Sequence, residues 1–288
     1  KKDKKKDKKK KRTRDDDADD LVHAATKKAS PPVSDGSSGP KSSDSGFSAA
    51  AAVLMPPAAH NAFCAEHNIE VSGRGADAFR AVEGFEGSGF TADILATTRG
   101  FTRPTPIQAV CWPIVSAPRD VVGVAETGSG KTLAFFLPAL AANVGSSRTG
   151  AGLRILILEP TRELAMQTES VCAKASAACG LSSVCLFGGV PKPPQIKAIR
   201  DGATVAVATP GRLLDLANEG IADLGSIQTL VLDEVRLRRA LRLPHLSAGT
   251  RASLPCCAFT SGARVRPRPL LTAPQASVPV ATRAGIDD

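Results

Sequence analysis

The sequence predicts an α/β fold built on a doubly wound parallel sheet. Between about Phe85 and Asp233, short apolar runs alternate with longer segments of helical periodicity. Runs that are apolar on both faces indicate strands covered by helices on both sides. The hydrophobic fraction of 42% in 288 residues is enough for a packed core of ordinary size.

Each element of this sheet is marked by its own run. The predicted strands are Asp120–Ala125, Leu153–Glu159, Ser183–Phe187, Thr204–Thr209 and Thr229–Asp233. The predicted helices are Gly130–Ala142, Thr161–Ala178, Pro194–Arg200 and Gly211–Asn218. Ligands of such sheets bind beyond the carboxyl ends of the strands, so we expect functional residues directly after each strand.

The N-terminal segment has a different composition. Residues 1–12 hold ten basic groups, five aspartates follow within 15–20, and a stretch rich in Ser, Pro, Gly and Ala reaches about residue 60. Such a segment buries too little apolar surface to offset its ordering entropy, so we predict that 1–60 is disordered and 61–84 is a linker. The basic run is typical of a nuclear or nucleolar address, or of loose contact with phosphates; a solvated tail with neither role is the alternative.

The segment after Glu234 changes character again. Residues 235–288 contain nine Arg, six Pro and no Lys. We therefore predict an irregular tail that does not continue the α/β domain. A frameshift, a retained intron or a gene-model error would explain it, and a naturally truncated product is the alternative.

Composition also argues against several classes of protein. No apolar run approaches the roughly 18–20 residues of a membrane span, and no secretory signal is visible. The seven cysteines are irregularly spaced and form no Cys-x-x-Cys pair, so we expect a reducing compartment and neither a disulfide framework nor a zinc site. The formal net charge is +9.

A phosphate-binding loop is the strongest local signal. It follows a predicted strand, opens a predicted helix, and consists of Ala125, Glu126, Thr127, Gly128, Ser129, Gly130, Lys131 and Thr132. Glycines let backbone N–H groups approach phosphate oxygens, Lys131 would neutralise the β and γ phosphates, and the Thr132 hydroxyl would bind Mg²⁺. A glycine-rich strand-to-helix turn without a ligand is the structural alternative.

A second signal is the apolar strand that ends in Asp233 and Glu234. In a phosphate-loop enzyme, the first acid holds Mg²⁺ through water and the next orients an attacking water. Many strands end in Asp, so this motif gains its meaning from the phosphate loop about a hundred residues upstream.

Four further segments complete a pattern: Phe101–Gln108 (FTRPTPIQ), Pro160–Ala165 (PTRELA), Gly188–Gly189 and Thr209–Arg212 (TPGR). In this order, together with AETGSGKT and VLDE, they closely resemble the DEAD-box ATP-dependent RNA helicases over about residues 85–234. The resemblance implies a RecA-like lobe. VVGVAETGSGKT, GGVPK and the Lys/Asp-rich N-terminus look most like a nucleolar subgroup that acts in maturation of large-subunit ribosomal RNA.

The resemblance implies a role for each motif. Gln108 would read the adenine edge, since an amide both donates and accepts, with Phe101 and also Phe85 on the base and Arg103 nearby. Lys131, Asp233 and Glu234 would be catalytic. The RNA backbone would be bound by Pro160, Thr161, Arg162, Gly188, Gly189, Thr209, Gly211 and Arg212. Thr161 and Thr209 could equally be helix N-caps, and both roles are compatible.

The sequence also departs from the family. Val235 and Arg236 replace the Ala and Asp that end the family's tetrapeptide, and Ser247–Thr250 and Phe259–Gly262 are only near misses to its Ser-Ala-Thr element. The 54 residues after Glu234 are too few for a second lobe of about 150.

Three functions therefore stay open. The first is an ATP- and Mg²⁺-dependent helicase of pre-ribosomal RNA in the nucleus or nucleolus. The second is a fragment that binds ATP and RNA without turnover. The third is an RNA-independent ATPase. No membrane partner and no oligomer are implied.

Overall fold

The computed structural model of the chain describes residues 46–117, 119–145, 152–234, 256–260 and 278–282. They contain one eight-stranded sheet in the order β1-β8-β2-β7-β6-β3-β5-β4. Every neighbouring pair is parallel except β1 with β8. The predicted doubly wound parallel sheet is confirmed. No helix in the described part of the chain is long and apolar enough to cross a membrane.

The predicted elements form close to their expected bounds. The strands are β2 (Val121–Val124), β3 (Ile155–Leu158), β4 (Ser183–Leu186), β5 (Val205–Ala208) and β6 (Thr229–Asp233). The helices are α4 (Lys131–Ala141), α5 (Arg162–Ala178), α6 (Lys192–Arg200) and α7 (Pro210–Asn218). A helix that was not predicted, α3 (Pro106–Ser116), begins within the FTRPTPIQ segment.

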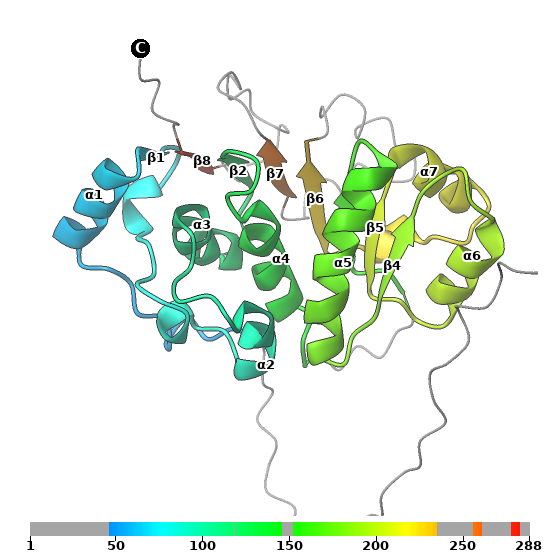
Figure 1. Cartoon of the computed structure of the whole chain (residues 1–288), viewed down its shortest axis with the longest axis horizontal. Helices are drawn as coiled ribbons and strands as arrows, with labels where there is room; N and C mark the ends of the chain where they lie inside the picture. The colour runs from blue at the N-terminus through cyan, green and yellow to red at the C-terminus, as the bar shows by residue number, and fades with distance from the viewer. Residues whose placement is uncertain (1–45, 118, 146–151, 235–255, 261–277, 283–288) are drawn as a thin grey trace, which may run out of the picture. The chain divides into compact units, whose positions relative to one another are not determined.

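Both faces of the sheet are covered. Ile155 and Ile157 of β3 pack into a core shared with α3, α4 and α5, whereas Leu156 and Leu158 pack into a second core with α7. Figure 1 shows α4 and α5 on the viewer's side of the strands. This alternation on a strand that is apolar throughout is the expected signature of a two-sided core.

Two further strands come from the segment after Glu234. β7 (Cys256–Thr260) lies between β2 and β6, and β8 (Val278–Thr282) lies on the other side of β2. The expectation that nothing after Glu234 continues the α/β domain is therefore wrong for these ten residues. Phe259 is 1% exposed and its ring packs on Phe135. Residues 235–255, 261–277 and 283–288 lie outside the described part of the chain.

The prediction for the segment before Phe85 also needs correction. The boundaries of 1–60 as disordered and 61–84 as a linker do not hold from residue 46 onward. Phe47 and Leu54 form isolated bridges with Phe90 and Val82, and these segments pack on the core that contains α3. The disorder predicted for residues 1–45 falls on residues that the structure does not describe.

Short elements complete this region. They are α1 (Pro57–Glu66), β1 (Ile69–Val71), η1 (Ala76–Ala78), η2 (Glu86–Ser88), α2 (Ala92–Leu95) and η3 (Ala96–Thr98), and η4 (Leu224–Ser226) precedes β6. Of these, α1, β1 and η1 fall in the segments predicted as tail or linker, because their apolar residues show no sustained helical or alternating period. Neighbouring elements supply the packing that they lack on their own.

Candidate functional site

The predicted site residues gather at one edge of the sheet. The parallel strands β2, β7, β6, β3, β5 and β4 all end there. The phosphate loop follows β2, Asp233 ends β6, and Thr209 follows β5. The residues that the sequence singled out thus lie beyond the carboxyl ends of the strands, where ligands of such sheets bind.

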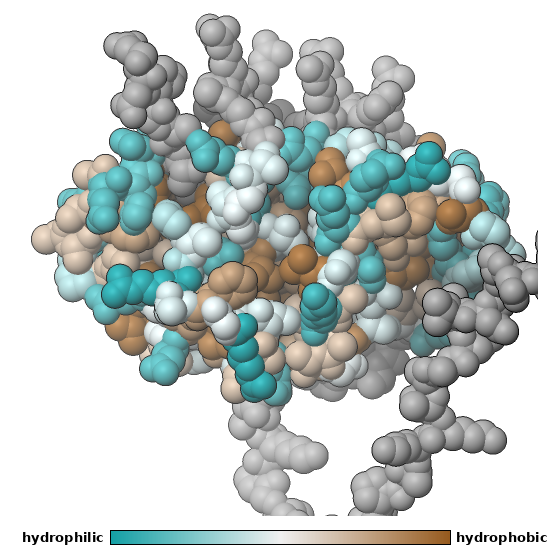
Figure 2. Space-filling model, in the orientation of Figure 1, coloured by the Kyte–Doolittle hydropathy of each residue, from teal (hydrophilic) through white to brown (hydrophobic). Residues whose placement is uncertain are grey.

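A cavity of about 760 Å³ opens at this edge. Its walls include Thr127, Gly128, Lys131 and Thr132 of the loop and helix α4. They also include Phe101, Asp233 and Glu234. Apolar residues of α4 and α5 extend the lining, and Figure 2 shows apolar surface gathered over the space between these helices. Phe101 is 64% exposed and is therefore free to pack on a ligand.

Six residues implied for the nucleotide are not part of the cavity lining: Phe85, Arg103, Gln108, Ala125, Glu126 and Ser129. Arg103 is exposed and Gln108 is buried beneath the loop. The ring of Phe85 packs on Trp112, 6.0 Å between centroids, and belongs to the core. The structure thus brings Phe101 but not Phe85 to the cavity.

Gln108 has two partners in this structure. Its Oε1 accepts a hydrogen bond from the Thr105 N–H at 3.1 Å, which forms a capping box at the start of α3. Its Nε2 donates to the Gly130 carbonyl at 3.1 Å. Gln108 therefore connects α3 to the phosphate loop, and its role in reading adenine stays a prediction.

The loop has the backbone that phosphate binding needs. Gly128 and Gly130 have φ of 85° and 88°, in the left-handed region that favours glycine. A Cβ on Gly130 would come within 2.6 Å of Gln108 Nε2, whereas one on Gly128 would meet no atom within 4 Å. Gly128 is needed for its φ, and Gly130 is needed for its φ and for space.

Lys131 is folded back onto this loop. Its Nζ donates to the carbonyls of Ala125 at 2.8 Å and Glu126 at 2.9 Å, and it lies 3.9 Å from Glu234 Oε1. The residue is 8% exposed. Bonds from the Lys131 ammonium to charged phosphate oxygens would be stronger than its present bonds to neutral carbonyls, so a bound phosphate would compete for this cation.

The two acids differ in environment. Asp233 is buried, and its Oδ1 has no hydrogen-bond partner among the described residues. Burial raises the pKa of Asp233 to about 6, with Lys131 opposing this and Glu234 adding to it. Glu234 has a φ of 55°, and its N–H donates to the Phe259 carbonyl at 2.8 Å. A non-glycine residue in this conformation is held there by its surroundings.

Strand β7 contributes directly to this site. The Ala125 N–H donates to the Thr260 carbonyl at 3.2 Å. Together with the bond from Glu234 to Phe259, this places the end of β7 between the phosphate loop and the acids. Phe259–Thr260 belongs to a near miss to the Ser-Ala-Thr element, so the sequence did contain a signal for this position.

Sequence reasoning also missed a third acid, Glu159. It follows β3, is 1% exposed, lines the cavity and accepts a hydrogen bond from Thr168 Oγ1 at 2.7 Å. Burial raises its pKa to about 8, and the charges of Asp233 and Glu234 act in the same direction. The signal was available, because Glu159 ends a predicted apolar strand just as Asp233 does.

The residues implied for RNA lie at the starts of α5 and α7 and in the loop after β4. Thr161 caps α5, and its Oγ1 accepts a hydrogen bond from the Leu164 N–H at 3.3 Å. Thr209 holds the cap position of α7, but its hydroxyl donates to the Leu186 carbonyl at 3.4 Å instead. The N-cap interpretation is therefore confirmed for the Thr161 side chain and wrong for that of Thr209. Pro160 and Gly211 are exposed.

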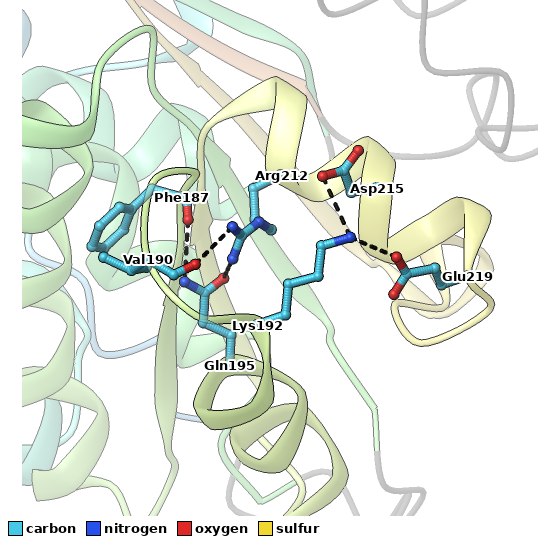
Figure 3. Close-up of polar contacts among 7 residues, drawn as sticks. All are labelled: Phe187, Val190, Lys192, Gln195, Arg212, Asp215 and Glu219. Atoms are coloured by element: carbon cyan, nitrogen blue, oxygen red, sulfur yellow. Dashed lines mark hydrogen bonds and ion pairs between the residues drawn. The ribbon is translucent and has the colours of Figure 1, made fainter. Parts of the chain in front are cut away.

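The two arginines implied for RNA are placed differently. Arg162 is exposed, and its Nη1 donates to the Gly188 carbonyl at 3.3 Å. Gly189 has a φ of 88°, and a Cβ there would collide with the Arg162 guanidinium. Arg212 is 7% exposed and donates to Gln195 and to the Val190 carbonyl (Figure 3).

Comparison with known proteins identifies the family. Residues 105–248 match the family model described as DEAD/DEAH box helicase. The match extends beyond Glu234, where the sequence resemblance was expected to stop. It covers half of the 288 residues and includes the loop and both acids.

Curated relatives agree with this match. The chain is 44% identical over 172 residues to DEAD-box ATP-dependent RNA helicase 5 of Oryza sativa subsp. japonica, covering 58% of this chain and 34% of the relative. It is 40% identical over 198 residues to ATP-dependent RNA helicase DBP3 of Mycosarcoma maydis, covering 62% and 34%. The chain thus spans about a third of the length of these relatives.

Solved structures show the same fold. The yeast DEAD-box splicing factor Prp28 has a TM-score of 0.67 at 24% identity, covering 81% of this chain and 58% of that one. Prp28 of Chaetomium thermophilum, bound to ADP, has a TM-score of 0.63 at 28% identity, covering 80% and 57%. From the family model, the relatives and the fold together, the chain belongs to the DEAD/DEAH box helicase family.

Proposed function

We propose that this chain is the nucleotide-binding lobe of an ATP-dependent RNA helicase. The observation that carries the proposal is the shared sheet edge, where a glycine loop, a buried lysine and two acids line one cavity while Arg162 lies exposed beside the diglycine segment. Family membership supports the same activity for the whole protein.

The residues of the cavity fit ATP with Mg²⁺. The unpartnered Oδ1 of Asp233 and the Thr132 hydroxyl would hold the ion, because both groups line the cavity and are hard oxygen donors. When bound, Mg²⁺ supplies positive charge that neutralises phosphate oxygens. Loop N–H groups from 127–132 and the Lys131 ammonium would bind the triphosphate. Phe101 and Gln108 would contact the adenine base.

We assign different roles to Asp233 and Glu234. Asp233 stays in the cavity wall at the end of β6, whereas Glu234 is partly exposed and reaches toward Lys131. Glu234 is thus the acid that can orient a water toward the γ-phosphate. Its bond to the Phe259 carbonyl keeps this geometry fixed.

RNA is the proposed partner because this edge of the sheet offers groups that can bind phosphates and that do not read bases. The N-termini of α5 and α7 lie there, and helix N-termini attract phosphate through free N–H groups. An RNA-independent ATPase would have no use for this arrangement. The Lys-rich N-terminus further supports pre-ribosomal RNA as the target and the nucleus or nucleolus as the location.

A second candidate is a binding module without turnover. Arg236 stands where the family has an acid, which places the wrong charge two residues from Glu234. We propose that the 288 residues alone bind ATP and RNA but release little phosphate. Strong RNA-stimulated phosphate release by this chain would rule out the second candidate and favour the first.

Nucleotide binding is tested by titrating the chain with a fluorescent ATP analogue. Lys131→Ala should weaken binding about 100-fold, the loss of charge-assisted bonds to a triphosphate. Lys197→Ala is the matched control, because Lys197 is an exposed cation on α6 that pairs with Asp201. Equal affinity of the Lys131→Ala variant and the unchanged chain would refute the assignment of the cavity.

A further inference from the structure

The loop after β4, which we call the diglycine loop (residues 187–191), is held on both sides of its glycines. Gln195 Nε2 donates to the Phe187 carbonyl at 3.2 Å, and Arg212 Nη2 donates to the Val190 carbonyl at 3.0 Å. Arg212 Nη1 donates to Gln195 Oε1 at 3.0 Å and joins the two contacts into one clamp. Figure 3 shows Arg212 and Gln195 meeting at this loop.

The glycines make such a clamp necessary. A Cβ on Gly188 would meet nothing within 4 Å, so packing does not restrain this residue, and Gly189 has the left-handed φ of 88°. Glycine backbones sample more conformations than any other and lose the most entropy on ordering. Bonds to the carbonyls before and after the pair restrict the conformations that the two glycines can adopt.

Arg212 is directed into this clamp rather than presented to solvent. It is 7% exposed, both terminal nitrogens donate to protein acceptors, and its buried Nε has no hydrogen-bond partner among the described residues. Its neighbour Lys192 is likewise engaged, with Nζ bound to Glu219 at 2.5 Å and 3.6 Å from Asp215 Oδ2. Arg162, in contrast, is exposed, and its Nη1 donates to the Gly188 carbonyl.

We propose that Arg212 and Gln195 are positioning residues that shape the diglycine loop for the RNA backbone, and that Arg212 does not itself contact a phosphate. Arg162 is the arginine of this edge that does. This inference rests on the proposed RNA binding. The two arginines of the PTRELA and TPGR motifs thus have different roles: Arg162 contacts RNA, and Arg212 holds the diglycine loop.

The salt dependence of RNA binding separates these tasks. Each phosphate contact that is lost flattens the slope of log K against log salt by about 0.7 for single strands, because fewer counterions are released. A short fluorescent oligouridylate is titrated with the chain over a range of salt concentrations. Arg162→Ala should weaken binding and flatten the slope.

Arg212→Ala and Gln195→Ala should behave alike. Each should weaken binding roughly three- to tenfold, the effect of one lost hydrogen bond, and leave the slope unchanged. The double variant should be no worse than either single variant, because both act through one clamp. Arg212→Lys should not rescue binding, because an ammonium lacks the planar fork that reaches two acceptors. A flattened slope for Arg212→Ala, equal to that of Arg162→Ala, would overturn the inference.

Amide hydrogen exchange without RNA gives an independent test. In Arg212→Ala and Gln195→Ala, the amides of 187–190 should exchange faster, while those of α4 should not change. Unchanged exchange in the loop of both variants would contradict the clamp. If the unchanged chain bound no RNA at all, the proposed function would fail while this measurement would still decide the clamp. If Arg212→Ala does not fold, Gln195→Ala alone tests the clamp.

Discussion

The cavity beside the phosphate loop and the proposed RNA-facing edge, formed by the starts of α5 and α7, the diglycine loop and α6, differ in how their charged side chains are buried. In the cavity, Lys131, Asp233 and Glu159 are buried, and Asp233 Oδ1 has no partner among the described residues. At the RNA-facing edge, Arg162 is exposed and Lys192 is paired with two acids. Buried charges respond strongly to single substitutions and to pH, whereas exposed charges respond mainly to salt.

The cavity depends on β7 more than the RNA-facing edge does. The Phe259 carbonyl accepts from the Glu234 N–H, and the Phe259 ring occupies the space that a Cβ on Gly123 would need. Phe259→Ala should lower the free energy of unfolding by about 3–5 kcal/mol, the cost of deleting a buried aromatic ring. Urea denaturation followed by circular dichroism measures this change.

Val53→Ala provides the control for this prediction, since Val53 is 57% exposed. It should change the stability by less than about 0.5 kcal/mol. If Phe259→Ala were equally neutral, β7 would not be part of the sheet, and the support of the phosphate loop by Thr260 would have to be abandoned.

The second prediction uses the buried carboxyl of Glu159, whose pKa is raised to about 8. The folded chain then holds a proton that the unfolded chain has lost above its ordinary pKa near 4.5. This contribution to stability is complete below that pKa and is lost as the pH rises through about 8. The melting temperature of the nucleotide-free chain should therefore fall as the pH rises from about 4.5 to about 8, and should level off above pH 8.

Glu159→Gln should remove this decline, because the amide does not titrate and its oxygen can still accept from Thr168. Asp233, whose pKa is raised to about 6, adds to the decline only below that pH, so the effect of Glu159→Gln is read between about pH 6 and 8. Glu163→Gln, an exposed acid on α5, is the control and should melt with the pH dependence of the unchanged chain. A decline that persists in Glu159→Gln would show that another group causes it.

The smallest effect is expected at the RNA-facing edge. Lys192 is a third exposed and pairs with Glu219 and Asp215, which are more exposed still. Surface ion pairs of this kind contribute little to stability, because water and salt screen them. Lys192→Ala should therefore leave the urea midpoint close to that of the unchanged chain, and closer still at high salt. A clearly lower midpoint would mean that the two regions do not differ as described.

Much of the fold could be predicted because β2 to β6 are apolar on both faces and flank recognisable helices. β7 and β8 could not, since each has five residues between Arg- and Pro-rich flanks, and Pro279 lies within β8. Their hydrogen bonds come from β2, β6 and β1, which lie far away in the sequence. Pairing with distant strands overrides weak local preference.

The sequence predicted where the site lies on the sheet better than it predicted where individual side chains point. The loop motif placed Lys131 and Thr132 on the cavity, as expected. The TPGR motif could not show that Arg212 turns inward, because its sequence does not contain Gln195 or the Val190 carbonyl that it binds. Contacts between residues far apart in the chain decide where a long side chain points.

The central claim is that one lobe carries two separate sites, and amide-resolved NMR titration tests it most directly. On adding ATP with Mg²⁺, we expect shifts for residues 125–132 and 233–234. On adding oligouridylate, we expect shifts for 161–162, 188–190 and 209–211. The same set of residues responding to both ligands, or no response to either, would contradict the account.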